Sequence, residues 1–385
     1  MKIKIISAIA LVTVVTVGLI IYFENSDEDS SPTIVSVTTT PTSKDEPTLT
    51  AEVLIDDLSN VWDIAFLPDN TLLFTERNGD LSRVVDGKKS LIAKIPNVYV
   101  QGEGGLMGLA VDSDFENNNY IYVCQNDNSG KTLDVRVARF ELSETNLSEP
   151  TYIVTGMPSK ESGRHSGCRV RSATNGHLWI TTGDAAQSSN PQSPNSLGGK
   201  VLRVNRDGKG IEGNLEDPFD NRIFSYGHRN VQGIVLFDSI EDEIFGYTSE
   251  HGPDVDDEIN ELKTGNFGWN PGSGYNEGVP MTDLNRFPDA HSALWSSGDP
   301  TMAVSGISLL TGKEWGSFEG HLAVASLKAQ HLRIIGIEEG KIIYEREFFS
   351  EFGRLRSAVL DRQGNLYLST DNSRDDKIIK VTPSS

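Results

Sequence analysis

Short apolar runs separated by polar turns dominate the chain from residue 49 onward. One unit recurs: an apolar run, a polar turn, and a second apolar run that ends in small or acidic residues. Runs of this length, bounded by Gly, Asn and Asp, predict β-strands joined in hairpins. The units span residues 62–76, 105–123, 162–184, 230–250, 306–328 and 357–370.

Repeats of this size cannot bury a core alone, so they predict an all-β fold in which they pack side by side as blades of a β-propeller. A third strand follows several pairs, as at 81–85 and 200–205. The last unit ends at 377–382 with little chain left for a fourth strand, and segment 51–55 could supply it. The N-terminal strand would then close the ring. Two β-sandwich domains are the alternative, but no linker interrupts the pattern after residue 49.

The first 48 residues differ from the rest in composition. Two lysines precede an apolar run over residues 5–23, which is long enough to cross a bilayer as a helix, and acidic residues follow it. We therefore expect residues 1–24 to be a membrane anchor or a signal peptide, and favour the uncleaved anchor because no clear cleavage site follows. Residues 25–48 predict a disordered Ser/Thr/Pro/acidic linker. The propeller domain, residues 49–385, would be extracytoplasmic, either tethered or secreted after cleavage.

Charge and cysteine content narrow the function classes. A net charge of −21 excludes general affinity for nucleic acid, because a phosphate backbone would be repelled. Cys124 and Cys168 are too few for a disulfide scaffold or a cysteine-ligated zinc site. A bridge between them requires neighbouring strands to bring them together, and we favour two unpaired buried thiols.

The third unit carries the most distinctive residue of the chain, His165, among small neighbours that let a flat ligand approach the backbone. Two apolar runs flank an Asn-Gly turn at 175–176, which is a strong hairpin signal. The hairpin returns the end of its second strand, Asp184, toward His165. A carboxylate beside an imidazole orients the ring and makes it a better base. A surface histidine on a strand is the alternative.

Unusual polar residues stand at equivalent places in several repeats, where the strands would enter the central channel. They are Glu103, His165, Arg229, Asn230, Lys328, Arg354 and Arg356. Isolated arginines are usually solvated surface residues. Four cations at one mouth of an acidic protein instead predict a pocket for a ligand with several carboxylates or phosphates.

A second unusual stretch, residues 249–260, contains a Gly-Pro turn that is followed by four carboxylates. Gly252 and Pro253 turn backbone carbonyls outward, and acidic side chains from Asp254 to Glu258 follow. Hard oxygen ligands of this kind suit calcium. A solvated acidic loop is the alternative.

Several motifs occur in a fixed order between residues 50 and 382, among them Gly163-Arg-His, Thr182-Gly-Asp, Tyr226-Gly-His-Arg-Asn and Ser249-Glu-His-Gly-Pro. On these motifs the sequence resembles the soluble quinoprotein glucose/sorbosone dehydrogenase family, in particular its branch of aldose sugar dehydrogenases that depend on pyrroloquinoline quinone (PQQ). The resemblance implies a six-bladed propeller that holds PQQ and calcium in its central mouth. It implies an oxidoreductase that converts the anomeric carbon of an aldose to a lactone by hydride transfer to the quinone.

The resemblance also implies roles for individual residues. His165 would be the general base and Asp184 its orienting partner. The cofactor-binding residues would be Glu103, Arg229, Asn230, Tyr275, Lys328, Arg354 and Arg356. The metal-binding residues would be Gly252 and Pro253, through their carbonyls to the catalytic calcium, and Glu258 with the Phe267 backbone, to a second, structural ion.

Glu103 departs from the family, which commonly has glutamine there, and this places the substrate contact in question more than the cofactor site. A calcium-dependent lactonase-like hydrolase and a non-catalytic sugar-binding propeller are alternative functions. A hydrolase would need the metal without the four cations, and a binding module would not need His165. The sequence leaves open the sugar, the electron acceptor, and whether the protein is a monomer or a homodimer.

Overall fold

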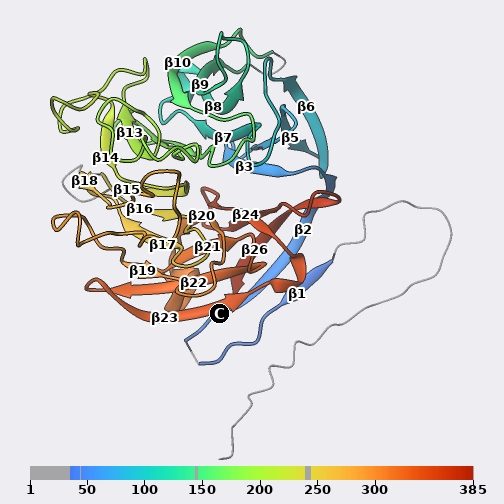
Figure 1. Ribbon diagram of the computed structural model, residues 1–385. Coiled ribbons are helices and arrows are strands. Elements are labelled where there is room, and N and C mark those ends of the chain that lie inside the picture. Colours follow the sequence, from blue (N-terminus) through green and yellow to red (C-terminus); the bar gives the residue numbers. More distant parts are fainter. Residues whose placement is uncertain (1–34, 44, 144–145, 239–243, 385) are drawn as a thin grey trace, which may run out of the picture.

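The computed structural model describes residues 35–43, 45–143, 146–238 and 244–384, and its sheets form a ring (Figure 1). Six antiparallel sheets follow one another around the ring, so the predicted six-bladed β-propeller is confirmed. The described helices are short: α1 (Phe115–Asn118), η1 (Lys313–Phe318) and η2 (Ser350–Phe352). None of the helices in these ranges is long and apolar enough to cross a membrane. The expected N-terminal anchor, residues 1–24, lies outside the described residues.

The first three blades follow the chain from the innermost strand outward. Their strands are β3 (Val61–Phe66), β4 (Leu72–Glu76), β5 (Asp80–Val85) and β6 (Lys88–Lys94); β7 (Leu106–Val111), β8 (Tyr120–Asp127), β9 (Asp134–Glu141) and β10 (Thr151–Pro158); and β11 (Val170–Ser172), β12 (Leu178–Thr181), β13 (Lys200–Val204) and β14 (Ile223–Tyr226). The two-residue strand β18 (Gly265–Asn266) pairs in parallel with β14 and extends the third blade.

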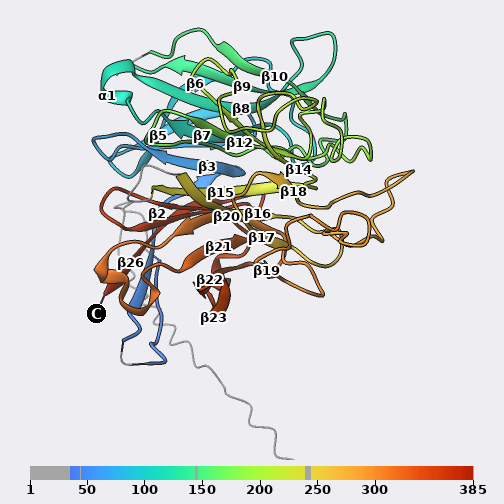
Figure 2. The ribbon, with the colours of Figure 1, turned by 90° about the vertical axis from the view of Figure 1, so that its left-hand side faces the viewer.

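The remaining blades repeat this order, except that the last one takes strands from both ends of the chain. Their strands are β15 (Val231–Asp238), β16 (Ile244–Glu250), β17 (Glu258–Glu261) and β19 (Trp295–Ser296); β20 (Val304–Leu309), β21 (Leu322–Ser326), β22 (His331–Glu338) and β23 (Lys341–Phe348); and β24 (Leu355–Leu360), β25 (Leu366–Thr370), β26 (Asp376–Ser384), β2 (Thr48–Leu58) and β1 (Ser36–Thr38). Figure 2 shows the green to orange loops between these strands projecting from one end of the ring.

The N-terminal strand closes the ring, as predicted. β2 pairs antiparallel with β26, with Ala51 opposite Val381, and the blue and red strands lie side by side in Figure 1. Leu49 and Ala51 are fully buried in a hydrophobic cluster with the last two blades. The pairing gives hydrogen-bond partners to the backbone N–H and C=O groups on the outer side of β26. It also joins chain segments more than 300 residues apart.

The described end of segment 25–48 differs from the expected disordered linker. β1 pairs with β2 from Ser36 to Thr38, and Glu46 is buried in an ion pair with Arg346. A strand of three residues is too short to show an alternating pattern of apolar and polar residues. The composition of the segment therefore predicted a disordered linker.

A buried ion pair joins the inner strands at the centre of the ring. Asp63 on β3 accepts a hydrogen bond from Arg169 at 2.5 Å and from the Leu109 amide at 3.0 Å. Burial opposes ionisation of Asp63, but Arg169 and Arg171 hold its pKa below the ordinary value. The Arg169 guanidinium also lies 4.4 Å from the Trp62 ring centroid. Breaking such a pair from one side is costly, because the other charge stays buried.

Cys124 and Cys168 form a disulfide, which corrects the expectation of two free thiols. Cys124 lies on β8 of the second blade, and Cys168 lies just before β11 of the third. Their Cα atoms are 6.2 Å apart, within the range that a disulfide spans. Sequence separation could not show this, because the contact depends on how two blades pack.

A fully buried lysine holds the long connection between β12 and β13. Lys200 Nζ donates to the carbonyls of Asn190 at 2.7 Å, Pro191 at 3.0 Å and Gly198 at 2.8 Å. One ammonium therefore satisfies three carbonyls of a loop that has no strand of its own. This loop begins at Asp184, so Lys200 supports a predicted site residue.

We predict that Lys200→Met lowers the free energy of unfolding by about 3 kcal/mol, because three buried carbonyls lose their donor. The midpoint of urea unfolding measures the change. Lys209→Met, the same substitution at an exposed position, is the control and should shift the free energy of unfolding by less than about 0.5 kcal/mol. Equal shifts for the two variants would show that the carbonyl contacts do not matter.

Candidate active site

His165 lies on a tight turn between β10 and β11, and small residues make the turn possible. Gly163 has a φ of +65°, and a Cβ there would collide with the Gln101 carbonyl. A Cβ at Gly183 would collide with the carbonyl of His165 itself. His165 has a left-handed φ of +53°, which is uncommon for a residue with a side chain. The side chain is 4% exposed, so the turn holds it almost completely buried.

The predicted pair of His165 and Asp184 is present in the structure. His165 Nδ1 lies 2.8 Å from Asp184 Oδ1, and the buried Asp184 receives three further hydrogen bonds. The Ala186 amide donates to Oδ1 at 2.7 Å, while Trp269 Nε1 and the Tyr275 hydroxyl donate to Oδ2 at 2.9 and 2.8 Å. Every one of these groups can donate, so together they supply the donors that a carboxylate accepts.

This arrangement fixes the tautomer of His165. A carboxylate only accepts, so Nδ1 must carry the proton that it shares with Asp184, and Nε2 then has the lone pair. The Tyr275 oxygen lies 2.9 Å from the same Nδ1. Burial and the Asp184 charge raise the pKa of Tyr275, so its hydroxyl keeps the proton that it donates. Within the described residues Nε2 of His165 has no hydrogen-bond partner, and it is the atom able to act as a base.

Glu103 contacts the backbone of the histidine turn. Its Oε1 accepts from the His165 amide at 3.2 Å, and its Oε2 accepts from Asn230 at 2.9 Å and from Gln232 at 3.3 Å. Burial opposes its ionisation, but the imidazoles of His165 and His251 and the Asn230 amide hold the pKa of Glu103 below its ordinary value. The structure therefore brings Glu103 and Asn230 to His165, as expected, and adds Gln232.

Arg229 lies beneath the loop that carries Tyr275. Its guanidinium pairs with Glu277 at 2.5 Å and donates to the His251 carbonyl at 3.0 Å, and Arg164 pairs with the other Glu277 oxygen at 2.5 Å. Burial opposes ionisation of Glu277, but Arg229 and Arg164 hold its pKa below the ordinary value. Two buried nitrogens here, Arg229 Nε and His251 Nε2, have no partner among the described residues.

Lys328 and Arg354 come together at the end of β21. Lys328 Nζ donates to Thr301 Oγ1 at 3.0 Å, and Arg354 donates to the carbonyl of Leu327, next to Lys328, at 3.3 Å. Burial lowers the pKa of Arg354, and the Asp371 charge opposes that change. The Arg354 guanidinium therefore lies against the backbone of the residue that precedes Lys328.

Arg356 connects this basic group to the histidine turn. Its Nε and Nη2 contact Asp371 Oδ2 at 2.7 and 2.6 Å, and its Nη1 donates to Gln232 Oε1 at 3.3 Å. Gln232 in turn reaches Glu103, which holds the His165 amide. Arg356, one residue of the predicted anion pocket, is therefore connected to the predicted base through hydrogen bonds of Gln232 and Glu103.

The turn predicted to bind the catalytic calcium is tightly constrained. The Gly252 amide donates to Asp257 at 2.8 Å, and a Cβ on Gly252 would collide with the Val255 carbonyl. Asp257 also accepts from the Met302 amide at 2.6 Å, and the Met302 carbonyl accepts from the Lys328 amide at 2.9 Å. These contacts hold the turn of Gly252 and Pro253 next to the basic group.

The residues predicted to bind a second ion also meet. Thr282 Oγ1 lies 3.3 Å from Glu258 Oε1 and 3.2 Å from the Phe267 carbonyl. Burial, with the nearby Glu250 charge, raises the pKa of Glu258 to about 8. No hydrogen bond between described residues links Glu258 or Phe267 to His165. Within the described ranges, no three His, Cys, Asp or Glu side chains form a metal-binding group.

Sequence reasoning missed four residues of the site: Gln232, Trp269, Glu277 and Asp371. Gln232 stands two positions after Asn230 on β15, so strand alternation could have placed it on the same face. Trp269 and Glu277 belong to irregular chain after β18, where no periodic pattern exists.

Asp371 makes the site sensitive to acid. Burial opposes its ionisation, but Arg356 and Asn60 hold its pKa at about 2. Below about pH 4 the unfolded chain binds a proton at Asp371 that the folded chain does not, so stability falls as the pH falls.

Between pH 5 and pH 2 the wild-type protein should lose free energy of unfolding because of Asp371. We predict that Asp371→Asn makes this loss about 2 kcal/mol smaller, measured by urea unfolding. Asp86→Asn, in an exposed turn, should leave the pH dependence unchanged. Parallel curves for wild type and Asp371→Asn would contradict the assignment.

The chain matches the Glucose / Sorbosone dehydrogenase family over residues 58–380. It is 27% identical to aldose sugar dehydrogenase YliI of Escherichia coli, over 87% of this chain and 93% of that protein. It resembles the crystal structure of the soluble aldose sugar dehydrogenase of Escherichia coli in the apo form, with 27% identity, a TM-score of 0.76, and coverage of 87% of this chain and 99% of that one.

A PQQ-bound aldose sugar dehydrogenase from Streptomyces coelicolor is similar too. It shares 28% identity and a TM-score of 0.73, with coverage of 87% of this chain and 98% of that one. The family match alone spans well over half of the sequence. The chain belongs to the Glucose / Sorbosone dehydrogenase family, as its motifs predict.

Proposed function

We propose that this protein is a PQQ- and calcium-dependent aldose dehydrogenase that oxidises the anomeric carbon of a sugar to a lactone. The observation that carries the proposal is the His165–Asp184 pair, whose Nε2 is left as an acceptor beside a basic pocket. Family membership and the similarity to a PQQ-bound aldose sugar dehydrogenase support it.

The residues of the pocket fit PQQ. This cofactor carries several carboxylates, and Lys328, Arg354 and Arg356 supply the cations that would pair with them. Arg229 Nε and His251 Nε2 are buried polar atoms without partners among the described residues, and a polar ligand would satisfy them. Glu103, Asn230 and Tyr275 would line the same site, next to His165.

The oxygen donors fit calcium at two places. Gly252 and Pro253 would offer carbonyls at the pocket, and Glu258 with the Phe267 carbonyl would hold a structural ion. Calcium prefers carboxylate and carbonyl oxygens, which are the donors present.

The chain's own residues would move the proton. When bound, the quinone would supply a hydride acceptor, and calcium held by the Gly252 and Pro253 carbonyls would polarise it. His165 Nε2 takes the proton of the anomeric hydroxyl as the C1–H bond releases a hydride, and the C1–O bond becomes the carbonyl of a lactone. Asp184 stabilises the resulting imidazolium, and Trp269 and Tyr275 hold Asp184 in position.

We also propose that the protein works outside the cytoplasm. Disulfides persist in oxidising compartments, and the Cys124–Cys168 bridge agrees with export directed by residues 1–24. A membrane tether in that segment stays a prediction.

Reconstitution tests the proposed function. Purified apoprotein with PQQ and calcium should reduce an artificial dye when an aldose is added, and a calcium chelator added before PQQ should prevent it.

We predict that His165→Ala still binds PQQ but loses turnover by about 10²- to 10⁴-fold, because only proton abstraction is removed. His177→Ala, near the turn of the same hairpin, is the control and should retain turnover. Wild-type turnover in His165→Ala would refute the base, and metal-dependent lactone hydrolysis without PQQ would favour a hydrolase.

The anion pocket can be tested separately by binding. We predict that Lys328→Ala and Arg354→Ala each raise the dissociation constant of PQQ about tenfold or more, because one carboxylate loses its charged partner. Fluorescence titration of the apoprotein measures it. Lys341→Ala, at an exposed position on β23, should bind like wild type. If all three variants bind PQQ equally, the pocket has been placed wrongly.

A further inference from the structure

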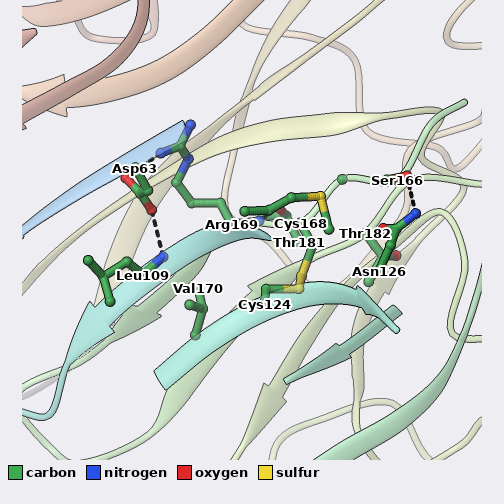
Figure 3. The surroundings of a disulfide bond; sticks show 12 residues. Asp63, Leu109, Cys124, Asn126, Ser166, Cys168, Arg169, Val170, Thr181 and Thr182 are labelled. Carbon is green, nitrogen blue, oxygen red and sulfur yellow. Dashed lines mark hydrogen bonds and ion pairs between the residues drawn. A yellow bond between two sulfur atoms is a disulfide. The ribbon is translucent and has the colours of Figure 1, made fainter. Parts of the chain in front are cut away.

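We propose that the Cys124–Cys168 disulfide positions His165, as the covalent member of a brace that ties the histidine turn to the second blade. The brace consists of the disulfide and the hydrogen bond between Asn126 and Ser166 (Figure 3). The inference rests on the proposed function, because it assigns the brace to the base of that reaction.

The two ties are matched in register. Cys124 and Asn126 are two apart on β8, so their side chains leave the same face of the strand. Cys168 and Ser166 are two apart on the turn, and Asn126 Nδ2 lies 3.2 Å from Ser166 Oγ. Both cysteines are fully buried, and Asn126 is fully buried as well. The turn is therefore held against β8 at two successive points, both C-terminal to His165.

The turn is also fixed at its two ends. Ser166 Oγ donates to the Gly163 carbonyl at 2.9 Å, which closes the turn around His165. Arg169 follows Cys168 directly, and its guanidinium contacts Asp63 at 2.5 Å and the Gln232 carbonyl at 2.9 Å. His165 keeps its left-handed φ between these fixed points, and a conformation of that kind persists where surrounding contacts determine it.

The disulfide lies close to the contact between His165 and its orienting carboxylate, Asp184. Asp184 belongs to the third blade, because it follows β12 and its amide donates to the Arg229 carbonyl at 2.8 Å. Cys124 belongs to the second blade. The disulfide therefore fixes one blade against the other beside the 2.8 Å contact between His165 and Asp184. Displacements of about 1 Å in a reacting group can cost 10²-fold in rate, so this placement matters for turnover.

The experiment must separate positioning from general stability. The test variant is Cys124→Ala/Cys168→Ala. Ser166→Ala keeps the disulfide and removes the hydrogen bond to Asn126, together with the hydrogen bond from Ser166 to the Gly163 carbonyl. Val137→Ala is the matched control: it lies opposite Cys124 on β9 in the same hydrophobic cluster, and its substitution leaves both ties of the brace in place. Amide hydrogen exchange of the apoprotein, read for the peptide 163–169, is measured first. kcat and KM for the sugar follow after reconstitution with PQQ and calcium.

We expect the double variant to exchange at least tenfold faster in peptide 163–169 and no faster elsewhere than Val137→Ala. We expect its kcat to fall about tenfold or more with KM within threefold, and Ser166→Ala to change both readouts in the same direction by less. If kcat and local exchange of the double variant match those of Val137→Ala, the bridge is only a stabiliser and the inference is wrong.

Two further outcomes are decisive. If the double variant fails to fold, unchanged local exchange and kcat in Ser166→Ala contradict the brace, and changed values support it. If wild-type protein oxidises no sugar, the proposed function fails, while exchange at 163–169 in the apoprotein still supports or refutes the brace itself.

Discussion

The site depends on the carboxylate of Asp184, which accepts four hydrogen bonds. Two come from groups that can only donate, the Ala186 amide and the Trp269 indole. The other two come from His165 and Tyr275. Because all four converge on one buried anion, the imidazole has a single orientation and a single useful tautomer. The chemistry proposed for the site follows from that constraint.

The fold supplies the remaining constraints by bringing distant segments to one end of a closed ring. His165 lies between the second and third blades, and Asp184 follows β12 of the third. The Tyr275 loop follows β18, and Arg356 comes from the last blade. Gln232 and Glu103 join them, so Arg356 and the base share one hydrogen-bond network. Ring closure by β2 and the central pair of Asp63 and Arg169 keep the blades in register. A small shift of one blade would alter several contacts of the site at once.

Much of the fold was readable from the sequence, because strand and turn patterns are local. The repeated units, the ring closure by segment 51–55 and the hairpin that joins His165 to Asp184 all correspond to described strands or contacts. The disulfide was not readable, since it depends on the packing of β8 against the turn before β11. Trp269 and Glu277 lie in irregular chain that no periodicity describes.

The family resemblance contributed what local patterns could not, namely the roles of Gly252, Pro253, Glu258 and Phe267. The structure brings Glu258 and the Phe267 carbonyl to one hydroxyl, that of Thr282, although they are nine residues apart on different strands and loops. Such a meeting has no signature in composition. Metal binding there stays a prediction of the resemblance.

The most direct test of the central claim is the protonation pattern of the His165 ring. Nitrogen-15 NMR of histidine-labelled apoprotein, with the signals assigned by comparison with His165→Gln, reports which ring nitrogen carries the proton. The account predicts that neutral His165 has its proton on Nδ1 and a bare Nε2. A neutral ring protonated on Nε2, or one that exchanges between the two tautomers, would contradict it.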